Sequence, residues 1–336
     1  MGVPHRHFAS IFLFAFLSLH GLSAKTESPL PVDPSTTEAL ETRQLNYLDA
    51  LILGAVEGIT EYLPISSTGH LILTNALLGL DSETPIPTAD GSPYRGKNGE
   101  PFTLKMAVDA YAIVIQIGAI LAVVLLYWKR LFRMGNGLLG RDPEGLRLVL
   151  NLLVAFMPAV VIGLLLNDWI ERMLFSPIPI AIALTFGSIL IWGAEWYRHR
   201  HGSAPDEGPD LHDLSYKQCL FIGLMQCVAM WPGTSRSMMT IVGSYLSGLN
   251  AKRSAEFSFL LGLITLSAAA GYKCLKNGSD MVAILAPGPV LFGTIVAFLF
   301  AIIAVKWLVA YLSKHGLGLF AWYRLIIAAL VLIFMR

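Results

Sequence analysis

Long apolar runs constrain the fold of this chain more than any other feature of its sequence. A helix of about 20 apolar residues is long enough to cross the hydrocarbon core of a bilayer. Only 14% of the residues are charged, whereas roughly 25% are charged in a typical soluble domain. The sequence therefore predicts an all-α integral membrane protein with about six transmembrane helices. The apolar runs lie around residues 110–128, 148–167, 179–196, 257–275, 289–312 and 319–335.

The N-terminal part of the chain differs from the rest. Residues 1–24 combine a basic start, a short apolar stretch and small residues at its end, which is typical of a signal peptide. Because Leu22 is not a small residue, an uncleaved signal anchor is the alternative. Residues 25–45 are rich in Pro, Ser, Thr and acids, so they are expected to form an exported linker. The membrane domain is expected to span residues 46–336.

Charged residues predict how the helices are oriented. Basic loops of membrane proteins face the cytoplasm, and several Lys and Arg residues lie in the segment 128–147. We therefore expect this segment and the segment 198–217 on the inside, and the acidic segment 81–105 on the outside. Over the whole chain, 24 Lys and Arg residues balance 23 Asp and Glu residues, which indicates no nucleic-acid partner.

The expected positions of the charged segments require the segments 46–80 and 218–249 to be re-entrant helical hairpins. Each hairpin enters and leaves the membrane on the same side. PISS (64–67) in the first matches PGTS (232–235) in the second. An odd number of spans follows each hairpin, which predicts an inverted repeat. The two hairpin tips are expected to meet near the midplane, since irregular backbone at membrane depth is tolerated where it lines a cavity. Repeat one is expected over about 46–197 and repeat two over about 218–336.

Two acidic side chains precede the first tip. Glu57 and Glu61 are four residues apart, so their carboxylates project from one face of a half-helix. Ionisable groups at membrane depth usually mark a site, although a solvated hairpin rim or a structural pair with a buried arginine would also explain them. Paired carboxylates suit a hard divalent cation, Mg²⁺ or Ca²⁺. The pairing of the two tips places Met225 and Ala229 in the corresponding positions of the second hairpin.

Small polar residues follow the acids at both tips. Pro64 is expected to end the first half-helix, so the residues after it open the next one. Free backbone N–H groups and the positive end of the helix dipole bind phosphate at such a start; ordinary helix capping is the alternative for each side chain. The candidate substrate-binding residues are Ser66, Thr68, Gly69, Gly233, Thr234, Ser235, Ser237 and Thr240.

Three further residues are candidates for catalysis. The planar guanidinium of Arg236 suits phosphate oxygens, with Glu57 or Glu61 as its alternative partner. Ser67 is the preferred nucleophile on the outer phosphorus, and water or His70 is the alternative. His70 lies one helical turn beyond Ser67, where it can give or take a proton, although a lone histidine is more often a satisfied core residue.

The segments EGITEYLPISSTGH (57–70) and PGTSRSMMT (232–240) resemble the two signature segments of the bacterial undecaprenyl-diphosphate phosphatases, also called bacitracin-resistance proteins. The resemblance extends from about Tyr47 to Phe334. It implies metal-dependent hydrolysis of undecaprenyl diphosphate, which recycles the lipid carrier of peptidoglycan synthesis and confers bacitracin resistance. It also implies a multi-pass protein of the bacterial cytoplasmic (inner) membrane with its site facing outward. By motif position it implies catalytic roles for Glu57, Glu61, Ser67, His70 and Arg236.

A polyprenyl-phosphate flippase or transporter is the alternative function, because inverted repeats with broken helices are also a transporter architecture. The acid-phosphatase-like lipid phosphatases fit poorly, since they require a histidine shortly after the arginine and SMMTIVGSYLSG after Arg236 has none. The expected partners are a polyprenyl diphosphate lipid and the bilayer. Whether the chain forms a homodimer is left open.

Overall fold

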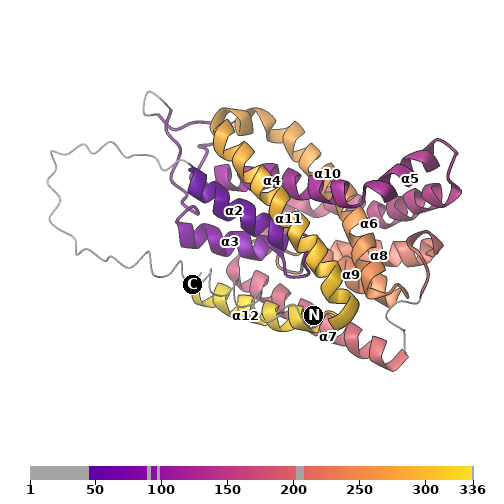
Figure 1. Ribbon diagram of the computed structural model, residues 1–336. Coiled ribbons are helices and arrows are strands. Elements are labelled where there is room, and N and C mark those ends of the chain that lie inside the picture. The colour runs from indigo at the N-terminus through magenta and orange to yellow at the C-terminus, as the bar shows by residue number, and fades with distance from the viewer. Residues whose placement is uncertain (1–44, 89–91, 97–98, 202–207, 335–336) are drawn as a thin grey trace, which may run out of the picture. The chain divides into compact units, whose positions relative to one another are not determined.

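The computed structural model describes residues 45–88, 92–96, 99–201 and 208–334. Within this part of the chain the regular structure is helical, as Figure 1 shows. The predicted all-α fold is therefore confirmed. The expected signal segment (1–24) and nearly all of the expected linker (25–45) lie outside the described residues.

Five of the described helices are long and apolar enough to cross a membrane. The predicted runs underlie them, and each helix extends beyond its run at one end or both. The sixth run forms a helix of 17 residues, α12 (Gly318–Phe334), which packs along α7. The chain is thus a multi-pass membrane protein, with five spans by length and one shorter apolar helix among the described residues. The five long helices are α4 (Leu104–Leu126), α6 (Pro143–Leu174), α7 (Pro177–His201), α10 (Ala251–Ile284) and α11 (Pro287–His315).

Two pairs of short helices occupy the places of the predicted hairpins. The first pair is α2 (Tyr47–Thr60) and α3 (Ser67–Leu78), and the second is α8 (Tyr216–Val228) and α9 (Arg236–Leu246). We call residues 61–66 the first break and residues 229–235 the second break. Their re-entry into a membrane stays a prediction.

The first break begins earlier than the sequence predicted. Helix α2 ends at Thr60 with Glu61 as its C-cap, rather than continuing to Pro64. Proline has no N–H to bond the carbonyl four residues earlier, and its ring clashes with that carbonyl. For Pro64 this carbonyl belongs to Thr60, so the proline ends the helix one turn before its own position.

Residues of the first break correspond to residues of the second break, but each partner lies one position later in the sequence than the predicted pairing gave. Ser66 and Ser235 are the N-caps of α3 and α9, with φ of 73° and 74°, and they are the two non-glycine residues with positive φ among those described. Ser66 therefore corresponds to Ser235, not to Thr234, and Pro64 to Gly233. The pairing from sequence was wrong because it aligned the two prolines. Glu57 and Glu61 consequently correspond to Gln226 and Met230 instead of Met225 and Ala229.

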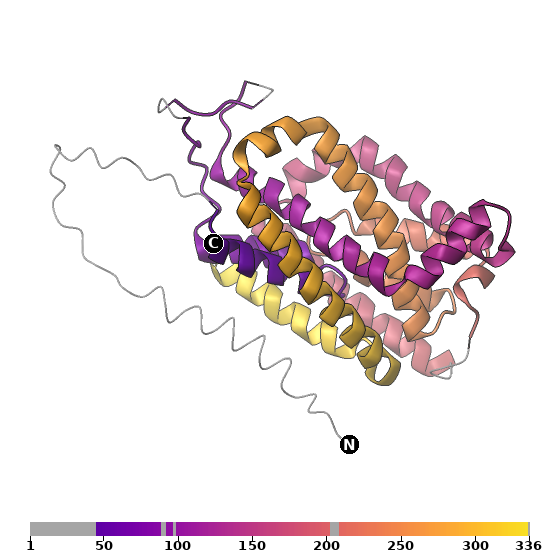
Figure 2. The same cartoon turned by 45° about the horizontal axis from the view of Figure 1, so that its top comes forward.

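Helix packing follows the same pattern in both halves of the membrane domain. Helix α2 packs on α11 and α8 packs on α6, while α3 contacts α12 and α9 contacts α7. Figures 1 and 2 both show α11 lying alongside α2. A Cβ atom at Gly58 would lie 2.3 Å from the carbonyl oxygen of Ala297, and one at Gly223 would lie 2.3 Å from that of Ala155. Each hairpin therefore packs tightly against a helix of the other half.

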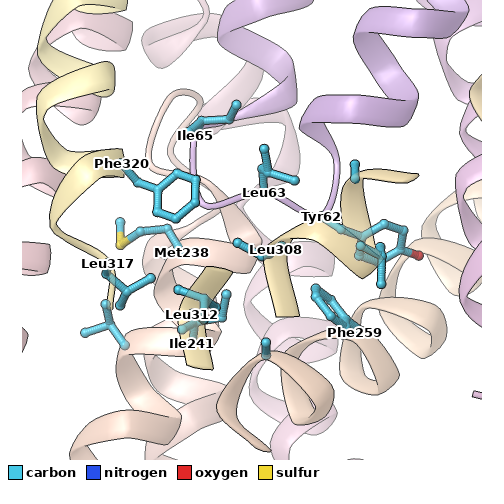
Figure 3. Close-up of a cluster of buried hydrophobic side chains, with 14 of the residues drawn as sticks. Tyr62, Leu63, Ile65, Met238, Ile241, Phe259, Leu308, Leu312, Leu317 and Phe320 are labelled. Carbon is cyan, nitrogen blue, oxygen red and sulfur yellow. The ribbon is translucent and has the colours of Figure 1, made fainter. Parts of the chain in front are cut away.

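The first break is anchored in a buried apolar cluster. Figure 3 shows Tyr62, Leu63 and Ile65 beside side chains from α9, α10, α11 and α12, and all of them are buried. Among these neighbours, Phe259 meets the Tyr62 ring edge-on at 5.4 Å between centroids. Close packing of this kind fixes a segment that has no regular hydrogen bonds of its own. The ends of α2 and α3 are held in place as a result.

One end of the fold is polar and is more ordered than the expected loop. The basic segment forms a helix, α5 (Trp128–Leu138). The short 3-10 helix η2 (Leu211–Asp213) begins directly after its N-cap, Asp210. Arg130 forms an ion pair with Asp210 at 2.9 Å. Arg133 hydrogen-bonds Asp142 and lowers the pKa of that carboxyl, which caps α6 by accepting a bond from the Gly145 N–H. These ion pairs make the segment compact.

The expected outer segment 81–105 has no regular element among its described residues before α4 begins at Leu104. Isolated bridges such as Pro85 with Thr103 hold its two sides together. Its predicted position outside the membrane stays a prediction.

Candidate active site

The first residues of α3 and α9, which follow the two breaks, converge on the carboxylate of Glu61. Arg236, the first residue of α9, donates from Nη2 to Oε1 of Glu61 at 2.8 Å. Ser67, the first residue of α3, donates from Oγ to Oε2 at 2.6 Å. The predicted meeting of the two tips is therefore observed, and Glu61 is the alternative partner named for Arg236. One carboxylate orients both the candidate nucleophile and the candidate phosphate ligand.

Helical geometry places Glu57 on the same face as Glu61, because the Glu61 N–H bonds the Glu57 carbonyl at 3.0 Å. Both side chains are buried, with 1% and 7% of their surface exposed. Gln116 of α4 lies near Glu57, and Oε1 of Glu57 has no hydrogen-bond partner within the described residues. An unpaired buried carboxylate oxygen is costly. This oxygen is therefore suited to a ligand supplied from outside the chain.

Arg236 is held in place by α10 and by Tyr62. Its Nη1 donates to the Ser258 carbonyl at 3.2 Å, and its Cζ lies 5.3 Å from the centre of the Tyr62 ring. A Cβ atom at Gly262 would lie 2.1 Å from Nη1, so glycine is needed there for the guanidinium to pass. The buried Nε of Arg236 is unpaired within the described residues, which leaves one N–H for an anion.

Exposure separates the site residues into two groups. Glu57, Glu61 and His70 are buried, whereas Ser67 and Arg236 are half-buried. The serine hydroxyl and the guanidinium are therefore the groups within reach of a substrate. The acids lie behind them.

The two nitrogens of His70 contact groups other than Ser67. Nδ1 lies 2.7 Å from the carbonyl oxygen of Ser66, and Nε2 lies 2.9 Å from the hydroxyl of Tyr323. The Ser67 hydroxyl bonds Glu61 instead. The geometry thus favours Glu61 rather than His70 as the proton acceptor for Ser67.

Several predicted substrate-binding side chains support the breaks through hydrogen bonds. The hydroxyls of Ser66 and Ser235 cap α3 and α9 by accepting from the N–H groups of Gly69 and Met238, both at 3.3 Å. Thr68 follows in the first turn of α3 and is half-buried. Capping, the alternative considered for these side chains, is therefore observed at the two serines. Their role in substrate binding stays a prediction.

The second break and α9 show the same use of hydroxyl groups. Ser237 donates to the Leu63 carbonyl at 2.6 Å and so ties α9 to the first break. Thr234 donates to the Trp231 carbonyl at 2.6 Å. Thr240 lies 2.6 Å from the Ser258 hydroxyl on α10. Gly233 adopts φ of 98°, a conformation that favours glycine. These contacts position the helix start, and a direct contact with substrate stays a prediction for these four predicted residues.

Arg324 was missed by the reasoning from sequence. It is fully buried on α12 and donates to backbone carbonyls, including those of Pro64 at 3.4 Å and Gly233 at 3.0 Å. These two carbonyls occupy corresponding positions in the two breaks, so one guanidinium joins both. The available signal was an arginine within the apolar segment AWYRLIIAAL, since intramembrane charges mark functional sites.

The donor atoms at the site fit a magnesium or calcium ion. No group of three or more His, Cys, Asp or Glu side chains gathers within the described residues, so the chain offers the two glutamates. Magnesium typically takes one or two carboxylates and completes its shell with water and substrate phosphate. The unpaired Oε1 of Glu57 is the oxygen that such an ion would use first.

Comparison with known proteins agrees with this geometry. The family model of the bacitracin resistance protein BacA matches residues 50–330. An undecaprenyl-diphosphatase of Sorangium cellulosum is 43% identical over 290 residues, covering 85% of each chain. Undecaprenyl-diphosphatase 2 of Rhodospirillum rubrum is 42% identical, covering 85% of this chain and 93% of the relative. An undecaprenyl-diphosphatase of Acinetobacter baumannii is 40% identical over 85% of this chain and 94% of its own.

Proposed function

Because this chain belongs to the BacA family of bacitracin resistance proteins, we propose that it hydrolyses undecaprenyl diphosphate to undecaprenyl phosphate and inorganic phosphate. The observation that carries the proposal is the bridge from Ser67 through Glu61 to Arg236. It joins a nucleophile, a base and an anion ligand in one place. The names of the relatives support hydrolysis and give no support to the flippase alternative.

In the proposed reaction, Ser67 Oγ attacks the outer phosphorus while its proton passes to Glu61 Oε2, which lies 2.6 Å away. The new O–P bond forms as the bond from this phosphorus to the bridging oxygen breaks, and undecaprenyl phosphate leaves. Water then attacks the phosphoserine, releases inorganic phosphate and restores the serine hydroxyl. Direct attack by water, with Glu61 as base, is the alternative route to the same products.

Charge stabilisation in this reaction is assigned to Arg236 and to the N-termini of α3 and α9. Phosphoryl transfer depends mainly on positioning and on neutralising the phosphate oxygens. Arg236 carries the positive charge, and the N-termini of α3 and α9 add the positive ends of two helix dipoles. The unpaired Nε of Arg236 is available for a phosphate oxygen.

We further propose that Glu57 and Glu61 hold a Mg²⁺ or Ca²⁺ ion. When bound, such an ion neutralises phosphate oxygens and orients the diphosphate. Each carboxylate oxygen has two lone pairs, so Glu61 can keep its bonds to Ser67 and Arg236. Chelator should abolish turnover, and Mg²⁺ or Ca²⁺ should restore it. Full activity in excess chelator would contradict this proposal.

The proposed location is the bacterial cytoplasmic membrane, with the site facing outward. The expected orientation of the acidic segment 81–105 and the lipid character of the substrate support this placement. Release of undecaprenyl phosphate there would return the carrier to peptidoglycan synthesis and lower the amount of diphosphate available to bacitracin. Whether the chain forms a homodimer stays open.

Purified full-length protein in detergent provides the test, because detergent leaves no second compartment for transport. We expect phosphate release from undecaprenyl diphosphate in the presence of Mg²⁺ or Ca²⁺. Ser67→Ala should lose activity, while the control Ser313→Ala should retain it, since the Ser313 hydroxyl bonds its own helix at the Val309 carbonyl. Absence of phosphate release by the unmodified protein would overturn the proposed function.

A further inference from the structure

The imidazole of His70 is held between the first break and α12. Its Nδ1 lies 2.7 Å from the Ser66 carbonyl oxygen, and its Nε2 lies 2.9 Å from the Tyr323 hydroxyl. The His70 and Tyr323 rings are also stacked, with centroids 5.6 Å apart and planes 4° apart. The side chain is therefore fixed at both nitrogens and on one face.

These contacts determine which nitrogen carries the proton. A backbone carbonyl can accept a hydrogen bond but cannot donate one, so the short contact to Ser66 requires a proton on Nδ1 of His70. In the neutral imidazole Nε2 is then an acceptor, and the Tyr323 hydroxyl is its donor. The order of donation runs from Tyr323 to His70 and from His70 to Ser66.

The last acceptor in this chain of hydrogen bonds is a strained residue next to the candidate nucleophile. Ser66 has φ of 73°, which is uncommon for a residue with a side chain, and Ser67 follows it directly. The corresponding residue in the second break, Ser235, has Met239 in the place of His70, and the methionine side chain has no N–H to donate. The first break thus has a side-chain support that the second break lacks.

Tyr323 is itself well fixed. It precedes Arg324, whose guanidinium bonds the carbonyls of both breaks. It cannot move far along α12 without breaking those bonds. Its hydroxyl is therefore a stable reference for the His70 ring.

We propose that Tyr323 is a positioning residue of this enzyme, whose hydroxyl fixes the tautomer and orientation of His70 and thereby the Ser66 backbone that presents Ser67. The proposal rests on the proposed function for its kinetic consequences. His70 accordingly supports the nucleophile through the backbone, while Glu61 takes the proton of Ser67.

The first test is Tyr323→Phe, which keeps the stacked ring and removes only the hydroxyl. Loss of one buried hydrogen bond is worth about 1 kcal/mol, so we expect kcat to fall roughly fivefold. KM should stay unchanged, because Tyr323 acts through His70. The control is Tyr311→Phe, since Tyr311 also stacks on a histidine, His315, at the far end of α11. An unchanged kcat in Tyr323→Phe would overturn the proposal.

A double-mutant cycle with His70→Ala tests whether Tyr323 acts through the histidine. Coupled residues show non-additive effects, so Tyr323→Phe should cause no further loss of kcat in the His70→Ala background. An equal loss in both backgrounds would contradict the proposal.

Nitrogen NMR of ¹⁵N-histidine-labelled protein supplies a readout that does not depend on activity. In the unmodified protein we expect His70, assigned by comparison with His70→Ala, to carry its proton on Nδ1. A proton on Nε2 alone would overturn the proposal even if Tyr323→Phe failed to fold. Failure of the proposed function would appear separately, as absence of phosphate release with the expected tautomer intact.

Discussion

At the scale of single residues, Glu61 is the centre of the site. Its two oxygens accept bonds from residues of opposite hairpins, Ser67 at 2.6 Å and Arg236 at 2.8 Å. A buried carboxylate between a hydroxyl and a guanidinium stays oriented without needing solvent. Loss of its charge should therefore affect the chemistry more than the fold.

Glu61→Gln tests this role. The amide keeps the shape of the side chain and can still accept a bond from Ser67, but it cannot take the proton. General base catalysis typically contributes about 10²–10⁴-fold, so we expect kcat to fall within that range. The measurement is phosphate release, with thermal melting as a check of folding. A kcat within about twofold of the unmodified protein would show that Glu61 is not the base.

Arg324 provides a second prediction. Arg324→Met should fill most of the space but leave the carbonyls of Pro64 and Gly233 without their donor. Each unsatisfied buried group costs about 1–3 kcal/mol, so the melting temperature should fall by about 5 °C or more. Arg253→Met is the control, since Arg253 also donates to a carbonyl, that of Pro209, but at the surface. Equal melting temperatures for both variants would contradict the prediction.

The sequence predicted the residues of the two motifs because their chemistry is concentrated in short segments. Glu57, Glu61, Ser67 and Arg236 do come together. Arg324 was not predicted, because its role depends on α12 lying against both breaks. Contacts between segments so distant in sequence leave no local pattern.

At the scale of elements, the apolar runs located every long helix in the described part of the chain, since about 20 apolar residues in lipid must form hydrogen bonds within the segment. The ends of the hairpin helices were less predictable. Helix α2 ends at Thr60 because of Pro64, a residue four positions later. The predicted pairing of residues between the two breaks was also wrong by one residue. The observed pairing depends on positive φ at Ser66 and Ser235 rather than on a shared residue type.

Helix α10 carries a prediction about close approach. In Gly262→Ala the added Cβ would lie 2.1 Å from Nη1 of Arg236. The guanidinium is the flexible end of its side chain and will move, so activity should fall at least about tenfold while stability changes by about 1 kcal/mol or less. Gly271→Ala on the same helix is the control, because its Cβ would meet open space. Equal activity in both variants would contradict the prediction.

At the scale of the whole molecule, the expected orientation can be tested by labelling. A single cysteine at Ser82, in a background with Cys219, Cys227 and Cys274 replaced, should react with an impermeant maleimide on intact cells. A cysteine at Ser215 should react only after the membrane is opened, because basic segments remain in the cytoplasm. Labelling of both positions from one side would contradict the predicted orientation, because three candidate membrane spans, α4, α6 and α7, lie between the two positions.

The packing of each hairpin on the opposite half also has a consequence for biosynthesis. Gly58 is made early, whereas Ala297, whose carbonyl it meets, lies near the end of the chain. At about 5–20 residues per second, translation takes on the order of tens of seconds to go from one to the other. During that time the first hairpin, with its two glutamates, is without the helix that covers it. The first hairpin of the nascent protein must therefore be protected until the last helices have been synthesised. We expect cellular quality control to treat a truncated chain as incompletely folded.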